Sequence, residues 1–297
     1  MTKTIAFIGL GVMGAPMAKR LAEAGYDVAV YNRSAAKAEE VAQESGARAA
    51  ASVSDAVSRA EIIITMLPDS PDVVDVLTPP EGVFANSPQH ALVIDMSTIS
   101  PDVSRDLAAT AADRGLRFLE APVSGGEVGA VNGTLSIMAG GSAEDFEHAR
   151  PVLEALGETI VRVGGHGAGQ TVKAANQLIV AGTIEIVAEA LTLLRARDVD
   201  MEPAVAVLSG GLASSRVLEN KTANFLDRDY RPGFRIALHD KDLRIARAAA
   251  STAKVAMPLG TLVGELMASA HARGDGGLDH SALIRGVELL SGREQND

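Results

Sequence analysis

Lys173 and Asn176 lie three residues apart in a stretch from Ala168 to Arg195 that contains no proline and repeats apolar residues at helical spacing. On a helix, side chains at this spacing share a face one turn apart. The ammonium can protonate an oxygen that becomes an alkoxide, and the amide can orient the lysine or a substrate. The first turn of a helix favours acids, so a lysine there points to a functional role rather than an exposed charge. We therefore predict one long helix from about Ala168 that carries a catalytic lysine.

A second chemically suggestive pattern is a glycine loop near the start of the chain, Gly9-x-Gly11-x-x-Gly14. It follows an apolar run and opens a helical pattern, which is the context of a dinucleotide-binding loop. The first glycine allows a tight turn, the second lets a pyrophosphate approach backbone N–H groups, and the third allows close helix–strand packing. The helix N-terminus adds partial positive charge. We expect cofactor contacts from Gly9, Leu10, Gly11, Val12, Met13 and Gly14. The alternative is a glycine-rich turn without a ligand.

The residues that end the second expected strand bear on the choice between NAD and NADP. An NAD site usually has an acid here for the ribose 2′-hydroxyl, whereas this chain has Asn32-Arg33-Ser34. Arg33 can pair with a 2′-phosphate, and Asn32 and Ser34 can donate to it. We predict NADP as the preferred cofactor, with NAD possible. Alternatively, Arg33 is a solvated surface residue and both cofactors bind.

Two further strand ends should line the same crevice, because ligands sit at the carboxyl ends of parallel strands. They contribute Leu67 and Pro68 from one strand and Thr98 from the next. The alternative for Leu67 and Pro68 is a plain exit from the strand. For Thr98 the alternative is a helix cap.

A third strand end is followed by Ser124-Gly125-Gly126, a hydroxyl beside unobstructed backbone N–H groups. Together these groups could bind a carboxylate, although an ordinary turn is an equal alternative. The sequence is not a Gly-x-Ser-x-Gly elbow, so a serine hydrolase is disfavoured. Further along, Lys241 could reach the cofactor or substrate, or be an exposed helix charge.

The elements that must position these residues change in kind along the chain. Short apolar runs predict strands at residues 4–8, 27–31, 61–67, 92–96, 117–120, 135–139 and 159–163. Because helical patterns fit between them, we expect a parallel sheet with right-handed crossovers. Helical patterns dominate afterwards, at residues 202–208, 214–224, 236–253, 258–272 and 281–290. The predicted fold is an α/β Rossmann-type domain over residues 1–163 and an all-α domain over residues 164–297, joined by the long helix.

Composition narrows the possible environments and partners. The chain has 297 residues, a formal net charge of −11 and no cysteine. The charge argues against nucleic acid or an anionic membrane as a partner. Lack of cysteine excludes disulfides and thiolate sites, and the scattered histidines suggest no metal. The chain enters its first strand without a secretory pattern, so we expect a cytoplasmic protein. The apolar run 178–194 is short and contains two glutamates, which favours a buried or interface helix over a membrane span.

Several stretches resemble, in order, the β-hydroxyacid dehydrogenase family, which includes 3-hydroxyisobutyrate dehydrogenase. The matching stretches are 9–21, 121–127, 133–136, 167–177, 210–215, 232–235 and 279–283. The resemblance implies that Lys173 is the catalytic lysine and that Ser124, Gly125, Gly126 and Asn176 contact the substrate. It implies cofactor contacts from Thr98 and Lys241. One departure is Gln177, where many relatives carry a second asparagine, and another is Asn32-Arg33.

The resemblance implies an NAD(P)-dependent oxidoreductase for a small semialdehyde or hydroxyacid, and the matching stretches favour reduction of tartronate semialdehyde to glycerate. One alternative is a sibling enzyme acting on methylmalonate semialdehyde, serine or another short β-hydroxyacid. An imine reductase is disfavoured, because resemblance to that class would imply an acid or aromatic residue where this chain has Lys173. A non-catalytic dinucleotide-binding module or a structural dimerisation protein would leave Lys173 unexplained. The apolar long helix and the small helical domain predict a homo-dimer or homo-tetramer.

Overall fold

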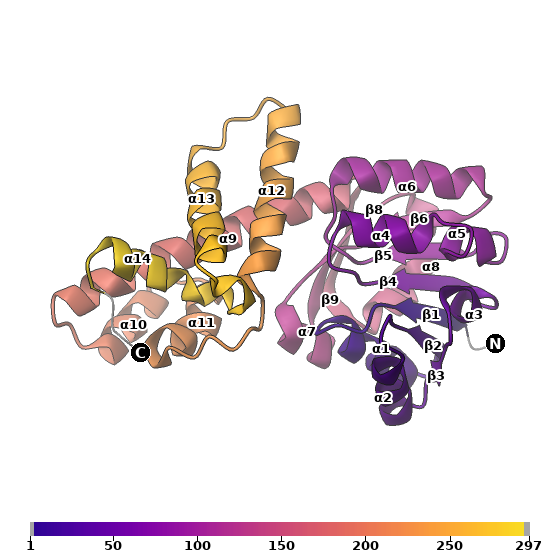
Figure 1. The fold of residues 1–297 in the computed structure, drawn as a ribbon, viewed down its shortest axis with the longest axis horizontal. Coiled ribbons are helices and arrows are strands. Elements are labelled where there is room, and N and C mark those ends of the chain that lie inside the picture. Colours follow the sequence, from indigo (N-terminus) through magenta and orange to yellow (C-terminus); the bar gives the residue numbers. More distant parts are fainter. Residues whose placement is uncertain (1–2, 294–297) are drawn as a thin grey trace. The chain divides into compact units, whose positions relative to one another are not determined.

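The computed structural model describes residues 3–293, and the chain forms two compact units, Met1–Lys173 and Ala174–Asp297. Within the described residues, one sheet of nine strands organises the first unit, in the order β3-β2-β1-β4-β5-β6-β8-β7, with β9 paired to β8 (Figure 1). The strands are β1 Thr4–Ile8, β2 Asp27–Tyr31, β3 Arg48–Ala49, β4 Ile62–Thr65, β5 Leu92–Asp95, β6 Arg117–Glu120, β7 Val123–Ser124, β8 Leu135–Gly140 and β9 Gly157–Gly164.

The sheet is parallel from β3 to β6, as predicted, but the expectation of an entirely parallel sheet is wrong. Strand β8 runs antiparallel to both β6 and β7. A parallel neighbour needs a crossover of a dozen or more residues. Only a seven-residue helix, α7 (Gly126–Asn132), lies between Ser124 and Leu135, so the chain turns back on itself.

Helices cover both faces of the sheet, as the alternating pattern of strands and helices requires. Along β1, Ile5 and Phe7 face one hydrophobic core and Ala6 and Ile8 face the other. This alternation is the two-residue period of a strand that is buried on both faces. The first core includes residues of α1 (Gly14–Glu23), α2 (Ala35–Ser45) and α8 (Ala143–Glu154). The second includes residues of α3 (Val53–Val57), α4 (Ser70–Leu77), α5 (Val83–Asn86) and α6 (Pro101–Asp113).

The second unit is helical, and it contains most of α9 (Ala168–Ala196), which begins at the predicted residue. The buried side of α9 contributes Ala181, Ile184, Ala188 and Leu191 to the core of this unit. The other elements are α10 Met201–Gly210, α11 Arg216–Asp227, α12 Ile236–Thr252, α13 Pro258–Ala272, the 3-10 turns η1 Asp275–Gly277 and η2 His280–Leu283, and α14 Ile284–Leu290. The predicted helix 281–290 is therefore a 3-10 turn followed by a shorter α-helix.

Candidate active site

The carboxyl ends of the parallel strands meet at one edge of the sheet. Register pairs Ile8 with Tyr31 and Thr65, Thr65 with Asp95, and Asp95 with Glu120. The residues that follow these strand ends include the glycine loop, Asn32-Arg33, Leu67-Pro68, Thr98 and Ser124-Gly125-Gly126. The structure thus places the predicted residues of the first unit beyond the carboxyl edge of its sheet, where open α/β folds bind ligands.

In the glycine loop, the backbone explains two of the three glycines. Gly9 has φ +99°, and a Cβ there would lie 2.4 Å from the carbonyl oxygen of Met66. A Cβ on Gly14 would lie 1.9 Å from the carbonyl oxygen of Gly9, so α1 packs too closely on the loop for a side chain. Gly11 is different, because a Cβ there meets nothing within 4 Å. The open space above Gly11, at the start of α1, fits a pyrophosphate approaching the helix N-terminus.

Asn32 and Arg33 have separate positions at the end of β2. The Asn32 Oδ1 atom accepts a hydrogen bond from the Leu10 N–H at 3.2 Å, which ties the glycine loop to the end of β2. Asn32 therefore has a structural role that the sequence did not suggest. Arg33 and Ser34 are exposed. The exposed guanidinium can meet a 2′-phosphate without breaking an existing core contact.

A buried carboxyl group connects the ends of β4 and β5. Asp95 Oδ1 accepts from the Thr65 hydroxyl at 2.8 Å and from the Ser97 N–H at 3.2 Å, and Asp95 is fully buried. Burial raises the pKa of Asp95 to about 6, against the lowering effect of the hydrogen bonds from Ser97 and Thr65. The Ser97 hydroxyl accepts from the Leu67 N–H at 2.9 Å, so the two strand exits are tied together next to half-buried Thr98.

Glu120, at the end of β6, anchors the start of α9. Its Oε1 accepts from the N–H of Gly169 at 2.7 Å and of Gln170 at 3.3 Å. Its Oε2 accepts from the Gly167 N–H at 2.8 Å and from the Ser104 hydroxyl. A carboxylate in this position satisfies N–H groups that have no partner within the helix and complements the helix dipole.

A second anchor joins the same turn of α9 to β5. The buried Gln170 side chain donates from Nε2 to the Ser97 carbonyl at 2.9 Å and accepts at Oε1 from the Ile99 N–H at 3.1 Å. Lys173 follows these anchors by less than one turn and is buried, with only 6 % of its surface exposed. Sequence reasoning missed Glu120 and Gln170. The only signal was an acid that ends a buried strand, and its partners lie far along the chain.

Beyond this turn, Asn176 and Gln177 lie on α9 and are bonded to each other and to α12. Asn176 Nδ2 donates to Gln177 Oε1 at 2.9 Å, and Gln177 Nε2 donates to Asp242 Oδ2 at 2.6 Å. Lys241 Nζ lies 2.8 Å from Asp242 Oδ1. Lys241, predicted as a cofactor contact, is therefore buried in an ion pair rather than lying as an exposed helix charge.

Two buried histidines support the same turn of α9. His239 Nε2 lies 3.1 Å from the Gln177 carbonyl oxygen, and His239 Nδ1 lies 3.0 Å from His280 Nδ1. A carbonyl only accepts, so His239 carries its proton on Nε2 and His280 donates from Nδ1. Burial lowers the pKa of His280 well below 6.5, with His239 adding to the effect and Asp279 opposing it.

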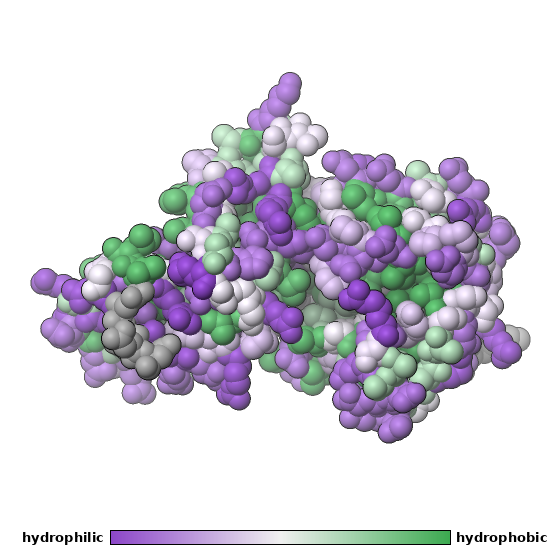
Figure 2. Space-filling view, in the orientation of Figure 1, coloured by the Kyte–Doolittle hydropathy of each residue, from purple (hydrophilic) through white to green (hydrophobic). Residues whose placement is uncertain are grey.

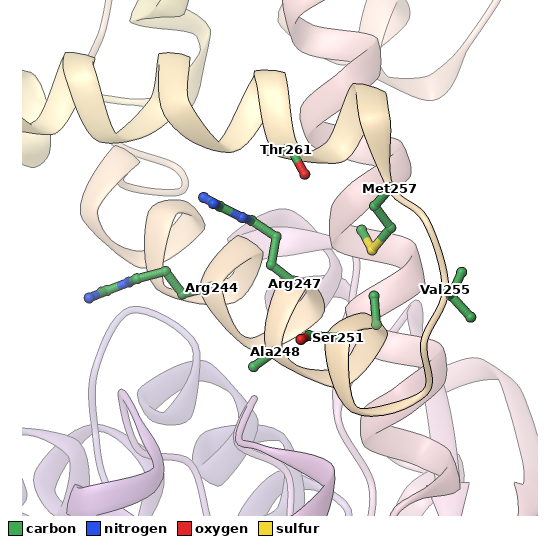
Figure 3. A pocket seen from close by; sticks show the side chains of 8 residues that line it. Arg244, Arg247, Ala248, Ser251, Val255, Met257 and Thr261 are labelled. Carbon is green, nitrogen blue, oxygen red and sulfur yellow. The ribbon is translucent and has the colours of Figure 1, made fainter.

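One pocket of about 710 Å³ lies elsewhere in the second unit, between α12 and α13 (Figure 3). Arg244 and Arg247 project from α12 beside it, and Thr261 faces it from α13. Arg247 pairs with Glu265 at 2.9 Å, and Arg244 lies 3.7 Å from Asp240. Acids already meet both guanidinium groups, and none of the predicted site residues lines the pocket. Among residues 3–293, no cluster of three or more histidines or acids could hold a metal ion.

Comparison with known proteins decides the family. Residues 4–165 match the model for the NAD binding domain of 6-phosphogluconate dehydrogenase, and residues 167–287 match the model for NAD-binding of NADP-dependent 3-hydroxyisobutyrate dehydrogenase. The chain belongs to the 3-hydroxyisobutyrate dehydrogenase family. It is an NAD(P)-dependent oxidoreductase acting on CH–OH groups. The predicted family and the predicted Rossmann and helical fold are confirmed.

Family members with different named substrates are similar to this chain over nearly its whole length. The 2-hydroxy-3-oxopropionate reductase of Escherichia coli is 42 % identical over 97 % of this chain and 98 % of its own. The 3-hydroxyisobutyrate dehydrogenase of Pseudomonas aeruginosa is 39 % identical over 94 % of this chain and 96 % of its own. The structure of Mycobacterium tuberculosis 3-hydroxyisobutyrate dehydrogenase with L-serine has a TM-score of 0.87 at 34 % identity, covering 97 % of this chain and 99 % of that one.

Proposed function

We propose that this chain reduces tartronate semialdehyde (2-hydroxy-3-oxopropanoate) to glycerate, reversibly, with NADPH preferred over NADH. The main support for this proposal is the position of Lys173, whose side chain is buried. It lies directly after the first turn of α9, and Glu120 and Gln170 hold that turn against the ends of β6 and β5. The 42 % identity with the reductase from E. coli supports this substrate. A buried lysine on a rigid support suits general acid chemistry, because its position costs no reorganisation during reaction.

The cofactor would be held by the first unit. The loop Gly9–Gly14 and the N-terminus of α1 would bind the pyrophosphate, with Leu10, Val12 and Met13 contributing loop contacts, and the open space above Gly11 supports this placement. Asn32, Arg33 and Ser34 would meet the ribose and its 2′-phosphate. Leu67, Pro68, Thr98 and Lys241 would contact the rest of the cofactor. Bound NADPH supplies the hydride.

The protein residues would orient the substrate and deliver the proton. We place the substrate carboxylate on Ser124 and on the backbone of Gly125 and Gly126. Both glycines are exposed and have positive φ, 137° and 62°, and neither puts a side chain over the backbone N–H groups. Lys173 Nζ would give its proton to the aldehyde oxygen as that oxygen becomes an alkoxide. Asn176 would contact the substrate from the next turn of the helix.

Steady-state kinetics on a substrate panel tests the function. The purified chain is given NADPH or NADH with tartronate semialdehyde, methylmalonate semialdehyde and other short semialdehydes, and kcat/KM is measured for each pair. We expect the highest kcat/KM for tartronate semialdehyde with NADPH. Identity of 39 % with a 3-hydroxyisobutyrate dehydrogenase makes methylmalonate semialdehyde the second candidate. Higher kcat/KM for that substrate would replace the first proposal, and no reduction of any semialdehyde would refute both.

We further propose that two copies of the chain associate through the exposed side of α9. Apolar side chains recur every seven residues on this side of the helix. We call them the α9 stripe: Val172, Ile179, Ile186 and Leu193, which are 39, 68, 61 and 63 % exposed. In an antiparallel pair about a two-fold axis, Ile179 faces Ile186 of the second copy. A Cβ on central Gly182 would meet nothing within 4 Å, which leaves room for close approach.

Other apolar side chains are exposed on α13 of the second unit. Leu259 and Leu262 on α13 are 75 and 57 % exposed, and the next residue after Leu259, Gly260, lies close to Leu178 of α9. On the face drawn in Figure 2, hydrophobic residues of the second unit are exposed between hydrophilic ones. Helix α9 is also long and apolar enough to cross a membrane, but it carries Glu185 and Glu189 along that run. We therefore propose a second copy as the occupant of the stripe and a cytoplasmic location for the assembly.

A further inference from the structure

A chain of hydrogen bonds connects Asn176 to an ion pair on α12. It runs from Asn176 Nδ2 to Gln177 Oε1 at 2.9 Å, and from Gln177 Nε2 to Asp242 Oδ2 at 2.6 Å. The other oxygen of Asp242 lies 2.8 Å from Lys241 Nζ. Gln177, Asp242 and Lys241 are all buried, so water does not compete for these bonds.

The chemistry of each group gives this chain of bonds one direction. An ionised carboxylate only accepts, so Asp242 must receive a hydrogen from Gln177 Nε2. The Gln177 amide is then turned with Oε1 toward Asn176, and this oxygen also only accepts. Asn176 must therefore point its Nδ2 group at Gln177, which directs its own Oδ1 away from Gln177. The contact between His239 and the Gln177 backbone further fixes the residue at the centre.

We propose that Gln177 and Asp242 are positioning residues that make Asn176 present its carbonyl oxygen to the substrate. They thereby select substrates that carry a hydrogen-bond donor at C2. This inference rests on the proposed function, in which Asn176 touches the substrate. Tartronate semialdehyde has a hydroxyl at C2 that can donate to Asn176 Oδ1. Methylmalonate semialdehyde has a methyl group there, which would leave that oxygen without a partner.

Exchanging the amide and the acid tests the direction of the bonds. In Asp242→Asn, the obligate acceptor is lost, so the Gln177 and Asn176 amides can reverse. In Gln177→Glu, two carboxylates face each other. The double variant Gln177→Glu/Asp242→Asn restores the direction, because the new glutamate accepts from Asn176 and from the new asparagine, whose oxygen faces Lys241. Asp240→Asn is the matched control, since Asp240 lies on the same helix but contacts His271 and Arg244 instead.

The measured quantity is the ratio of kcat/KM for tartronate semialdehyde to kcat/KM for methylmalonate semialdehyde. We expect Asp242→Asn to lower this ratio about tenfold, the effect of one hydrogen bond that only the hydroxylated substrate can lose. The double variant should recover most of the ratio, and Asp240→Asn should leave it unchanged. Calorimetric binding of glycerate and of 3-hydroxyisobutyrate to the NADP⁺-loaded variants should follow the same order without turnover.

Each result decides something different. An equal loss for both substrates in Asp242→Asn, or no recovery in the double variant, would assign these residues a purely structural role and overturn the inference. In that case the proposed function would survive, because the unaltered chain still reduces tartronate semialdehyde. An unaltered chain that reduces neither semialdehyde would overturn the proposed function, and the inference with it.

Discussion

The Glu120 carboxylate accepts a hydrogen bond of 2.7 Å from the backbone N–H of Gly169, which joins the end of β6 to the first turn of α9. A side chain at Gly140, on the neighbouring strand β8, would not fit beside Glu120, because its Cβ would lie 2.2 Å from Glu120 Oε1. Lys173 follows in the next turn of α9, near the positive end of the helix dipole, which disfavours a cation. The Glu120 carboxylate at this N-terminus opposes that effect and fixes the backbone that carries Lys173.

We predict that Glu120→Gln destabilises the protein by about 3 kcal/mol. Both oxygens of Glu120 accept hydrogen bonds from buried donors, so an amide NH₂ in either place faces another donor. The measurement is the free energy of unfolding from urea titration. The exposed substitution Glu127→Gln is the control and should change it by less than about 0.5 kcal/mol. Equal stability of the Glu120 and Glu127 variants would show that the anchor contributes nothing.

Lys173→Ala should lower kcat by about a thousandfold, the usual range for loss of a general acid. NADPH binding should persist, because the glycine loop and Arg33 do not involve this side chain. Turnover with tartronate semialdehyde and NADPH fluorescence titration measure the two properties separately. Turnover near that of the unaltered chain would rule out the catalytic role, whatever the binding result.

Arg33→Ala should raise the KM for NADPH about tenfold and leave the KM for NADH within about twofold. The guanidinium is exposed, and it would pair with the 2′-phosphate that NADPH carries and NADH lacks. Initial rates with each cofactor, at a fixed semialdehyde concentration, provide the comparison. If both KM values rise together, Arg33 supports the loop and does not select the cofactor.

Asp95→Asn should stabilise the protein more at pH 7.5 than at pH 5. The pKa of Asp95 in the folded chain is about 6, above the ordinary value of 3.8, so folding favours the protonated acid. Ionising Asp95 therefore lowers the free energy of unfolding. This loss is small below pH 4, grows as the pH rises, and levels off above pH 6 at about 3 kcal/mol. Asparagine does not ionise, so the stability difference between variant and parent should grow by about 1 kcal/mol between the two pH values.

Urea titration of both proteins at each pH measures this difference, and all other titrating groups cancel in the comparison. Burial is the main cause of the shift, and Asp95 Oδ2 has no hydrogen-bond partner among the described residues. A difference that is the same at pH 5 and pH 7.5 would mean that Asp95 keeps an ordinary pKa.

The sequence predicted best what depends on neighbours along the chain. The glycine loop, the strand from Thr4 to Ile8 and the start of α9 at Ala168 follow from local patterns, and the structure agrees. Glu120 and Asp242 were missed, because their roles depend on partners that only folding brings close. Gln177 was noted only as a departure from relatives, yet it bonds both Asn176 and Asp242. The reversal of β8 was missed because the short strand β7 was not predicted. Without β7, the connection between residues 120 and 135 is long enough for a parallel crossover.

The α9 stripe leads to the last prediction, on assembly. Ile179→Glu/Ile186→Glu should convert a dimer or larger assembly into a monomer with unchanged helix content. Both side chains are more than half exposed, so the charges cost little in the folded monomer, whereas a two-fold axis would bring four carboxylates together in an apolar interface. Sedimentation measures the mass, and Leu212→Glu, fully exposed and outside the stripe, is the control. An unaltered chain that is monomeric at micromolar concentration, or that binds lipid vesicles through α9, would rule out the proposed interface.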